Sequence, residues 1–308
     1  MEPPVPPIGI IETAPTLELG PRAFDIRHRA VVMGILNRTP DSFYDKGSYW
    51  AFDAFLAKAE QLVVDGADFL DVGGVKAGPG DEVTESEELD RVVPAVEALA
   101  ARFDLPLSVD TWRSGVAQAC FAAGAHVGND ISGFADPAYL DVCAAAGAAV
   151  VATHIRLAPR VPDPDPHYDD VVATVCRFLD DRATRARAAG IPPERIMVDA
   201  GLDLGKTEPQ SLELLRRSDR LVALGYPVFL SASNKRFLWT HLGVDVASAA
   251  TGTLGAHALG IALGCRVLRA HDARAGRRVA DTMAAVLSGE LPPMRMPAEL
   301  GGSGGRDA

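Results

Sequence analysis

The strongest constraint on the fold is a repeated alternation of short apolar runs with longer amphipathic segments, from residue 31 to residue 288. The runs are apolar throughout, which is typical of parallel strands covered on both faces. They occupy residues 31–36, 68–73, 106–110, 126–130, 148–154, 195–199, 227–231 and 265–271. The segments after them predict helices over residues 52–65, 86–101, 113–123, 136–146, 168–189, 208–224, 248–263 and 275–288.

Glycines separate many of these helical segments from the next apolar run, where left-handed helix ends are expected. They are Gly66, Gly124, Gly147, Gly190, Gly225 and Gly264. Eight strand–helix units in one α/β chain predict a single-domain TIM (β/α)8 barrel over residues 23–288. The alternative is an open doubly wound sheet, which favours a GxGxxG turn after its first strand. Here the sequence NRTPDSF follows that strand.

The two ends of the chain differ from this pattern. Residues 1–22 are rich in proline and predict a flexible N-terminal arm. Residues 289–308 end in GGSGGRDA and predict a flexible C-terminal tail.

Composition excludes several classes of partner. The formal net charge of −11 argues against nucleic acid and anionic membranes as partners. There is no apolar stretch of about 20 residues, the length that a membrane span needs. The N-terminus lacks the basic and apolar regions of a secretory signal, and the four cysteines are scattered. A cytoplasmic location is therefore expected.

Polar residues lie at the ends of the apolar runs, and in a TIM barrel all of them would face one rim. Asp110, Asn129 and Asp199 supply two carboxylates and one amide, a set that suits a flat heterocycle with several N–H groups. Each of them alone could equally cap the following helix. Their coincidence on one rim favours a binding site.

Cationic side chains lie at or just after the ends of the last two runs. Lys235, Arg269 and a protonated His271 would together suit an anionic group such as a phosphate. The alternative is that Lys235 and Arg269 are solvated loop charges. The glycine-containing loop DLGK at residues 203–206 could also approach a phosphate.

Several long motifs resemble one known family, dihydropteroate synthase. They are MGILNRTPDSF, DFLDVGG, SVDTWR, GNDISGFADP, VDAGLDLGK, SASNKRF and LRAHD, in the family's order, between Val31 and Leu287. The resemblance implies a TIM barrel that joins p-aminobenzoate to 6-hydroxymethyl-7,8-dihydropterin pyrophosphate and releases pyrophosphate. It also implies a homodimer.

On the pterin side, the resemblance assigns four residues. Asp110, Asn129 and Asp199 would hold the pterin ring, and Lys235 would lie beside the ring and help to bind the second substrate. The resemblance places Lys235, Arg269, His271 and Asp45 among the catalytic residues.

On the pyrophosphate side, the resemblance implies that Asn37 coordinates Mg²⁺ together with the pyrophosphate. Arg269 and His271 would hold the leaving pyrophosphate, and Asp45 would belong to a mobile first loop that closes over the site. Fixed cations and Mg²⁺ are a natural means of stabilising the charge that builds on this leaving group.

The second loop departs from the family's usual Gly-Gly-Glu-Ser-Thr-Arg-Pro-Gly. Val75 replaces the Glu, Ala77 the Thr and Gly78 the Arg. Losing an Arg–phosphate contact would cost about 1.5–3 kcal/mol, the scale of a charged hydrogen bond. Lys76 would return the charge without the bidentate fork of an arginine.

These variants resemble the second dihydropteroate synthase-like paralogue of some bacteria, a subgroup thought to lack synthase activity. Asp203 and Leu204 also stand where Gly and Phe are usual. We therefore expect a pterin-binding barrel with weak or lost condensation. The alternatives are a fully active synthase in which Lys76 compensates and, less favoured, a folate-dependent methyltransferase-like barrel.

Overall fold

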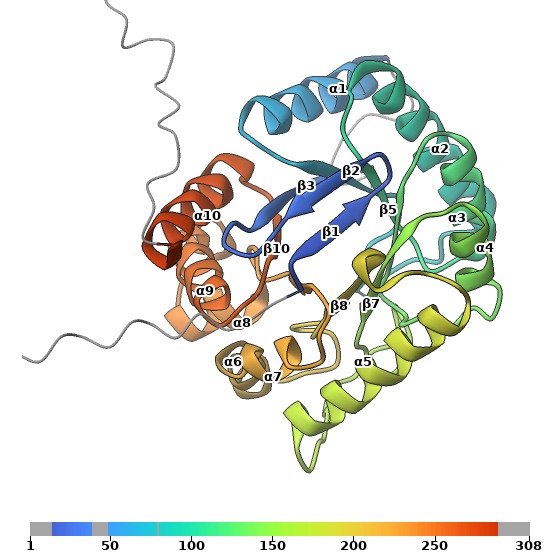
Figure 1. The fold of residues 1–308 in the computed structure, drawn as a ribbon. Helices are drawn as coiled ribbons and strands as arrows, with labels where there is room; N and C mark the ends of the chain where they lie inside the picture. The colour runs from blue at the N-terminus through green and yellow to red at the C-terminus, as the bar shows by residue number, and fades with distance from the viewer. Residues whose placement is uncertain (1–13, 39–48, 79, 289–308) are drawn as a thin grey trace, which may run out of the picture.

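A computed structural model describes residues 14–38, 49–78 and 80–288. Eight parallel strands form a closed barrel in the order β10-β3-β4-β5-β6-β7-β8-β9 (Figure 1). Their bounds are β3 Val31–Asn37, β4 Phe69–Gly73, β5 Leu107–Asp110, β6 Val127–Asp130, β7 Ala149–Thr153, β8 Ile196–Asp199, β9 Val228–Leu230 and β10 Val267–Ala270. Because β10 pairs with both β3 and β9, the sheet has no free edge. This confirms the predicted TIM barrel.

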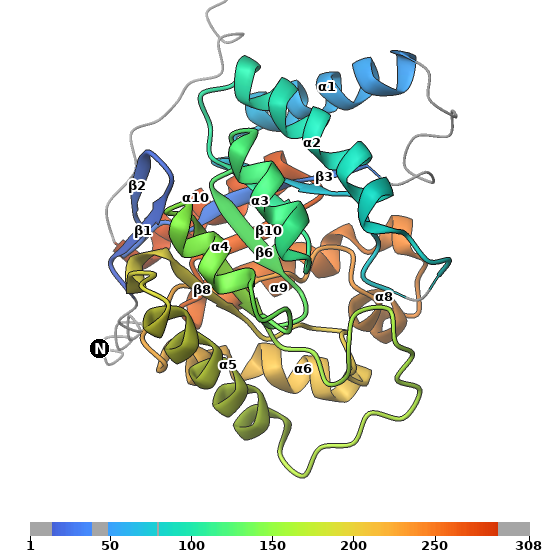
Figure 2. The same cartoon turned by 90° about the vertical axis from the view of Figure 1, so that its right-hand side faces the viewer.

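Helices surround the barrel (Figures 1 and 2). They are α1 Tyr49–Val64, α2 Glu85–Arg102, α3 Ser114–Ala122, α4 Tyr139–Ala145, α5 Val171–Ala188, α6 Glu208–Arg216, α7 Ser218–Val222, α8 Arg236–Leu242, α9 Ala250–Ala262 and α10 Ala273–Ser288, with short 3-10 turns at Pro193–Arg195 and Val246–Ser248. The predicted helix over 208–224 is broken at Arg217, and α8 was not predicted. The six glycines expected at helix ends all have positive φ, from 63° to 111°.

The start of α2 illustrates how local sequence sets an element. The Thr84 hydroxyl accepts from the Glu87 N–H, and the Glu87 carboxylate accepts in return from the Thr84 N–H. This capping box satisfies main-chain donors that the first helical turn would otherwise leave unpaired.

A hairpin closes one end of the barrel. Strands β1 (Thr16–Leu19) and β2 (Arg22–Asp25) pair antiparallel and lie across the end where the barrel strands begin (Figure 1). Leu17, Leu19 and Ile26 are fully buried there, in one apolar cluster with residues of the barrel interior such as Met33 and Phe69. The expectation of a flexible arm over 1–22 is therefore wrong for residues 16–22, whose alternating apolar side chains fill the barrel end.

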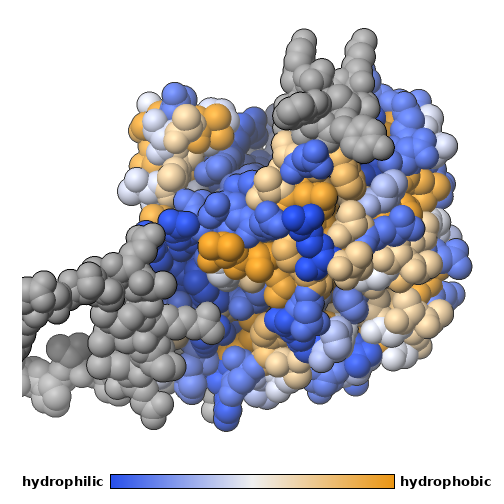
Figure 3. Space-filling model, turned by 90° about the horizontal axis from the view of Figure 1, so that it is seen from above, coloured by the Kyte–Doolittle hydropathy of each residue, from blue (hydrophilic) through white to orange (hydrophobic). Residues whose placement is uncertain are grey.

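The opposite end holds the loops that follow the strands. In Figure 2 the hairpin lies at one end of the barrel and α8 at the other. The rest of the arm, residues 1–13, and the tail over 289–308 lie outside the described residues. Seen from the side that is uppermost in Figure 1, the surface mixes small apolar patches with hydrophilic residues (Figure 3). None of the described helices is long and apolar enough to cross a membrane.

Candidate active site at the carboxyl end of the barrel

Strand register brings the predicted site residues to one level of the barrel mouth. Asn37 pairs in register with Gly73, Gly73 with Asp110, and Asp110 with Asn129. Register partners on neighbouring strands point to the same side of a sheet, so these side chains share the inner face. Asp199, the last residue of β8, lies one strand beyond β7 on the same rim. The predicted pterin-side set is therefore assembled at one end of the barrel.

Arg269 joins two of these strands by ion pairs. Its Nη2 lies 2.8 Å from Asp71 Oδ2 and 2.9 Å from Asp110 Oδ2. Asp71 is fully buried and also accepts from the Ser108 hydroxyl at 2.6 Å and from the Asn129 amide at 3.2 Å. No role is predicted for Asp71 from the sequence. A carboxylate within an apolar run was the available signal.

Burial dominates the electrostatics of this network. It raises the pKa of Asp110 to about 7, although the neighbouring Arg269 favours the charged carboxylate. Two carboxylates around one guanidinium also leave Arg269 largely neutralised. In this structure Arg269 is engaged by Asp71 and Asp110, and its role in holding an anion stays a prediction.

His271 differs from expectation in its charge. Its Nδ1 lies 3.0 Å from the Ser233 hydroxyl, which also accepts from the His271 main-chain N–H at 3.2 Å. Burial, helped by the nearby charges of Arg269 and Lys235, lowers the pKa of His271 to about 4. His271 is therefore a neutral imidazole near pH 7, and it is not a third cation of the rim.

Asp199 and Lys235 form the other side of the mouth. The Asp199 carboxylate accepts from the Gly201 main-chain N–H at 2.8 Å, and burial raises its pKa. Lys235 Nζ donates to the Leu202 carbonyl at 2.9 Å. Burial lowers the pKa of Lys235, and the carboxylates of Asp199 and Asp203 oppose this shift.

The DLGK loop does not present its lysine to the rim. Lys206 is 2% exposed, and its Nζ donates to the carbonyls of His154, Gly201 and Leu204 at 2.9–3.2 Å. Nζ also lies 2.9 Å from His154 Nδ1. Burial lowers the pKa of Lys206 to about 7. Lys206 holds its own loop closed, so its ammonium is not available to a phosphate at the rim.

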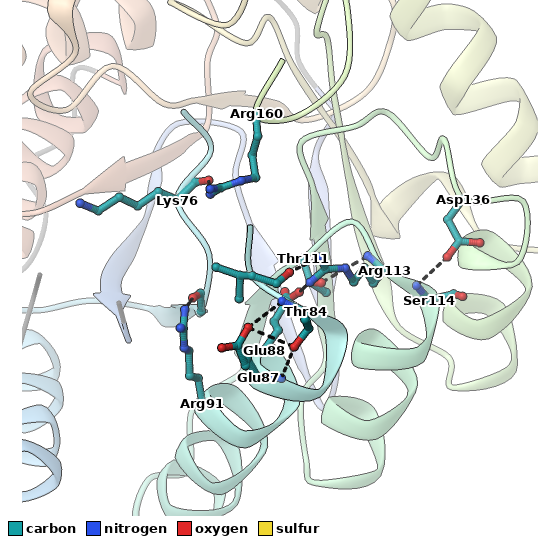
Figure 4. Close-up of polar contacts among 12 residues, drawn as sticks. Lys76, Thr84, Glu87, Glu88, Arg91, Thr111, Arg113, Ser114, Asp136 and Arg160 are labelled. Atoms are coloured by element: carbon teal, nitrogen blue, oxygen red, sulfur yellow. Dashed lines mark hydrogen bonds and ion pairs between the residues drawn. The ribbon is translucent and has the colours of Figure 1, made fainter. Parts of the chain in front are cut away.

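The second loop, residues 74–84, is attached to the loop that follows β7 (Figure 4). Arg160 Nη1 donates to the Lys76 carbonyl at 3.1 Å, and its other terminal nitrogen donates to the Asp81 carbonyl. The Arg160 main-chain N–H donates to the Ala77 carbonyl at 3.2 Å. In Figure 4 the Lys76 side chain extends away from Arg160. Val75 is 6% exposed, so it packs inward and offers nothing polar.

The metal prediction rests on a single described ligand. Asn37 ends β3 and is exposed, and its amide oxygen lies beside Gly73. Within the described residues, no cluster of three or more His, Cys, Asp or Glu is placed to hold a metal ion. One protein oxygen fits a Mg²⁺ bound mainly by substrate phosphates and water. Asp45 lies outside the described residues.

Comparisons with known proteins agree with this geometry. The model of the pterin binding enzyme family matches residues 33–271. The chain is 44% identical over 273 residues to inactive dihydropteroate synthase 2 of Mycobacterium leprae, covering 87% of this chain and 94% of that protein. It is 38% identical over 262 residues to dihydropteroate synthase of Streptococcus pyogenes serotype M3, with 83% and 95% covered.

A solved structure has the same fold. The Xanthomonas albilineans dihydropteroate synthase with 4-aminobenzoic acid superposes with a TM-score of 0.82 at 39% identity, covering 89% of this chain and 98% of that one. The long motifs of the sequence, the closed barrel and these matches lead to one conclusion. The chain belongs to the pterin-binding enzyme family and, within it, to the dihydropteroate synthase group.

Proposed function

We propose that this protein binds a dihydropterin, carried as its pyrophosphate, at the carboxyl end of the barrel. The observation that carries the proposal is the convergence of Asp110, Asn129 and Asp199 on one rim. A pterin ring presents several N–H donors and a carbonyl acceptor in one plane, and two carboxylates with an amide complement it. The family membership supports the same ligand class.

The synthase reaction makes limited demands on the protein. The amine nitrogen of p-aminobenzoate would form a bond to the pterin methylene carbon, while the bond from that carbon to the pyrophosphate oxygen breaks and its electron pair leaves with the pyrophosphate. The nitrogen would give its proton to the released pyrophosphate or to water. Neutral His271 can donate a hydrogen bond to the leaving oxygens, and Lys235 can stabilise their charge. Asn37 would be a ligand of Mg²⁺, which supplies further charge stabilisation when bound.

We propose further that condensation is weak or lost, because the second loop lacks its usual donors. Ala77 and Gly78 provide no hydroxyl and no guanidinium, and Val75 is packed inward. The main chain of the loop is already bonded to Arg160 at Lys76 and Ala77. The relative from Mycobacterium leprae, which is named inactive, supports this proposal.

Calorimetric titration with the pterin pyrophosphate and Mg²⁺, followed by an assay of dihydropteroate formation, tests both parts. We expect pterin binding with little or no turnover. Space is available at Gly78, where an added Cβ would meet nothing within 4 Å, so an Ala77→Thr/Gly78→Arg variant should fold and gain turnover. Ala188→Arg, at an exposed position of α5 outside the site, is the control. An ordinary synthase rate in the unmodified protein would overturn the proposed loss.

The alternative of an active synthase rests on Lys76, whose ammonium would replace the missing guanidinium. A Lys76→Met variant separates the two proposals, because it should abolish turnover only if Lys76 compensates. A folate-dependent methyltransferase-like barrel has no specific observation in its favour, since the chain matches dihydropteroate synthases along most of its length.

We also propose a homodimer that covers the groove between α9 and α10. The groove is mainly apolar, with Leu254, Val279 and Met283 in its lining. Leu259 and Val286, on the same helices, are 44% and 57% exposed. Light scattering should give twice the monomer mass, and Val286→Glu should lower it. A cytoplasmic location stays a prediction, which cell fractionation tests.

A further inference from the structure

Lys206 holds together the loop between β8 and α6. Its Nζ donates to the carbonyl of His154, the residue after β7, and to the carbonyls of Gly201 and Leu204 within the loop. A lysine ammonium has three N–H donors, one for each of these carbonyls. One buried nitrogen therefore attaches the loop at two points to itself and, through His154, to the end of the neighbouring strand.

The two attached residues, Gly201 and Leu204, enclose the part of the loop that contacts the candidate site. The Gly201 main-chain N–H donates to the Asp199 carboxylate at 2.8 Å. The carbonyl of the next residue, Leu202, accepts from Lys235 Nζ at 2.9 Å. Asp199 and the lysine are the two residues expected to contact the pterin on this side of the barrel mouth. Both are thus bonded to main-chain atoms of the segment that Lys206 holds.

The backbone of this loop needs such support. Gly201, Asp203 and Gly205 have φ values of +62°, +68° and +62°, so three left-handed residues alternate with others and no regular element forms. The hydroxyls of Tyr168 and Ser211 bond to the main chain of Gly205 and Asp203. These contacts lie farther along the chain from Asp199, whereas Lys206 holds the carbonyl of Gly201 itself.

We propose that Lys206 is a positioning residue for the pterin site and sets the Asp199 carboxylate and the Lys235 ammonium by holding the loop that both contact. This inference rests on the proposed pterin binding. Lys206 is 2% exposed, so it acts through the loop and not by touching the ligand. If the loop arrangement that Lys206 stabilises favours the ligand, the bound ligand must stabilise that arrangement by the same factor.

Arg266 provides a matched control at the opposite end of the barrel. It is 1% exposed, and its guanidinium donates to the carbonyls of Ile261 and Cys265 at 2.8 and 2.9 Å and to that of Arg27 at 3.3 Å. Like Lys206, it is a buried cation that holds main-chain carbonyls. Because it directly precedes β10, it lies where the strands begin and not at the candidate site.

Calorimetric titration of the full chain with the pterin pyrophosphate and Mg²⁺ compares the unmodified protein with Lys206→Met and Arg266→Met. Circular dichroism first identifies a temperature at which each protein is folded. Both variants should lose stability, because each leaves buried carbonyls without a donor. We expect Lys206→Met to bind the pterin pyrophosphate about 10-fold more weakly and Arg266→Met to change the affinity less than about twofold. A role in stability alone would leave both affinities unchanged.

Amide hydrogen exchange of the unmodified protein tests the same inference without a variant. The reporters are the main-chain N–H groups of Gly201 and Leu204, which donate to the Asp199 carboxylate and to the Gly201 carbonyl. Saturation with the pterin pyrophosphate should slow their exchange about 10-fold more than that of the Cys265 N–H, by the reciprocity of linked equilibria. Cys265 lies beside Arg266 and reports any slowing that comes from global stabilisation.

The possible failures are distinguishable. Absence of pterin binding by the unmodified protein overturns the proposed function and this inference with it. Pterin binding that Lys206→Met does not weaken, or that Arg266→Met weakens equally, overturns the positioning role alone. Exchange at Gly201 and Leu204 that saturation slows no more than exchange at Cys265 also overturns that role, and this comparison needs no variant to fold.

Discussion

Replacing Arg269 with Gln should destabilise the fold, because it removes the guanidinium between two carboxylates. In the native protein the side chains of Arg269, Asp71 and Asp110 are 17%, 0% and 15% exposed. Removing one partner of a buried ion pair costs about 3–5 kcal/mol. The hydroxyl of Ser108 and the amide of Asn129 would still donate to Asp71. We therefore expect the free energy of unfolding to fall by about 3 kcal/mol, the lower end of that range.

The loss should depend on pH in a defined direction. The pKa of Asp110 is raised to about 7 in the folded protein from its ordinary value of 3.8. The folded state therefore binds more protons than the unfolded chain between these values, and the stability that this gives is lost as the pH rises through 7. Without Arg269 the pKa of Asp110 rises further. Protonation then relieves the repulsion at pH 5, but much less at pH 8.

Urea unfolding followed by circular dichroism at pH 5 and pH 8 measures both effects. We expect Arg269→Gln to lose clearly more stability at pH 8 than at pH 5. The double variant Asp71→Asn/Arg269→Gln is the control, and it should recover at least about 1 kcal/mol at pH 8, because the remaining carboxylate no longer faces a second charge. A loss below about 1 kcal/mol at pH 8, or an equal loss at both pH values, would refute this account of the network.

Three further outcomes follow from the packing. Gly201→Ala should prevent stable folding, because its Cβ would lie 2.0 Å from a main-chain oxygen, whereas Gly190→Ala, with open space around it, should cost only about 1 kcal/mol in thermal melts. Arg160→Ala should speed amide hydrogen exchange in the second loop, because it removes the hydrogen bonds from the Arg160 side chain to that loop. Arg156→Ala is the control and should leave this exchange rate unchanged. Equal exchange rates in the two variants would contradict the attachment of the second loop to Arg160. His257→Leu should raise the melting temperature, more at pH 5 than at pH 7, because burial lowers the pKa of His257 to about 4 and its two ring nitrogens have no partner in the described part of the chain. An unchanged melting temperature would show that this histidine is satisfied.

The sequence was sufficient to predict a structural feature wherever that feature depends on contacts between residues close together in the chain. The predicted glycine helix ends all have positive φ, since a left-handed residue follows a helix whatever the rest of the fold does. The Thr84–Glu87 capping box was set within four residues. The break of the predicted helix at Arg217 and the additional helix α8 had no such local signal, because packing against the barrel decides where these segments end.

Long-range contacts decided the chemistry of the rim. The sequence indicated Lys235, Arg269 and His271 as cations but could not show how they are paired. Arg269 lies opposite Asp71, 198 residues away in the chain, and Lys206 turns inward onto His154. Both arrangements depend on strands that meet only when the barrel closes.

The amino-acid sequence by itself determined the eight strand–helix units, the rim to which their polar residues belong and the family, because periodicity, helix ends and motif order are properties of neighbouring residues. Only the tertiary structure decided which charges of that rim are neutralised and how the hairpin of residues 16–25 closes the barrel. Charge and burial depend on partners that are distant in the chain, and their effect on a pKa or on a ligand is fixed by distances that exist only in the folded barrel.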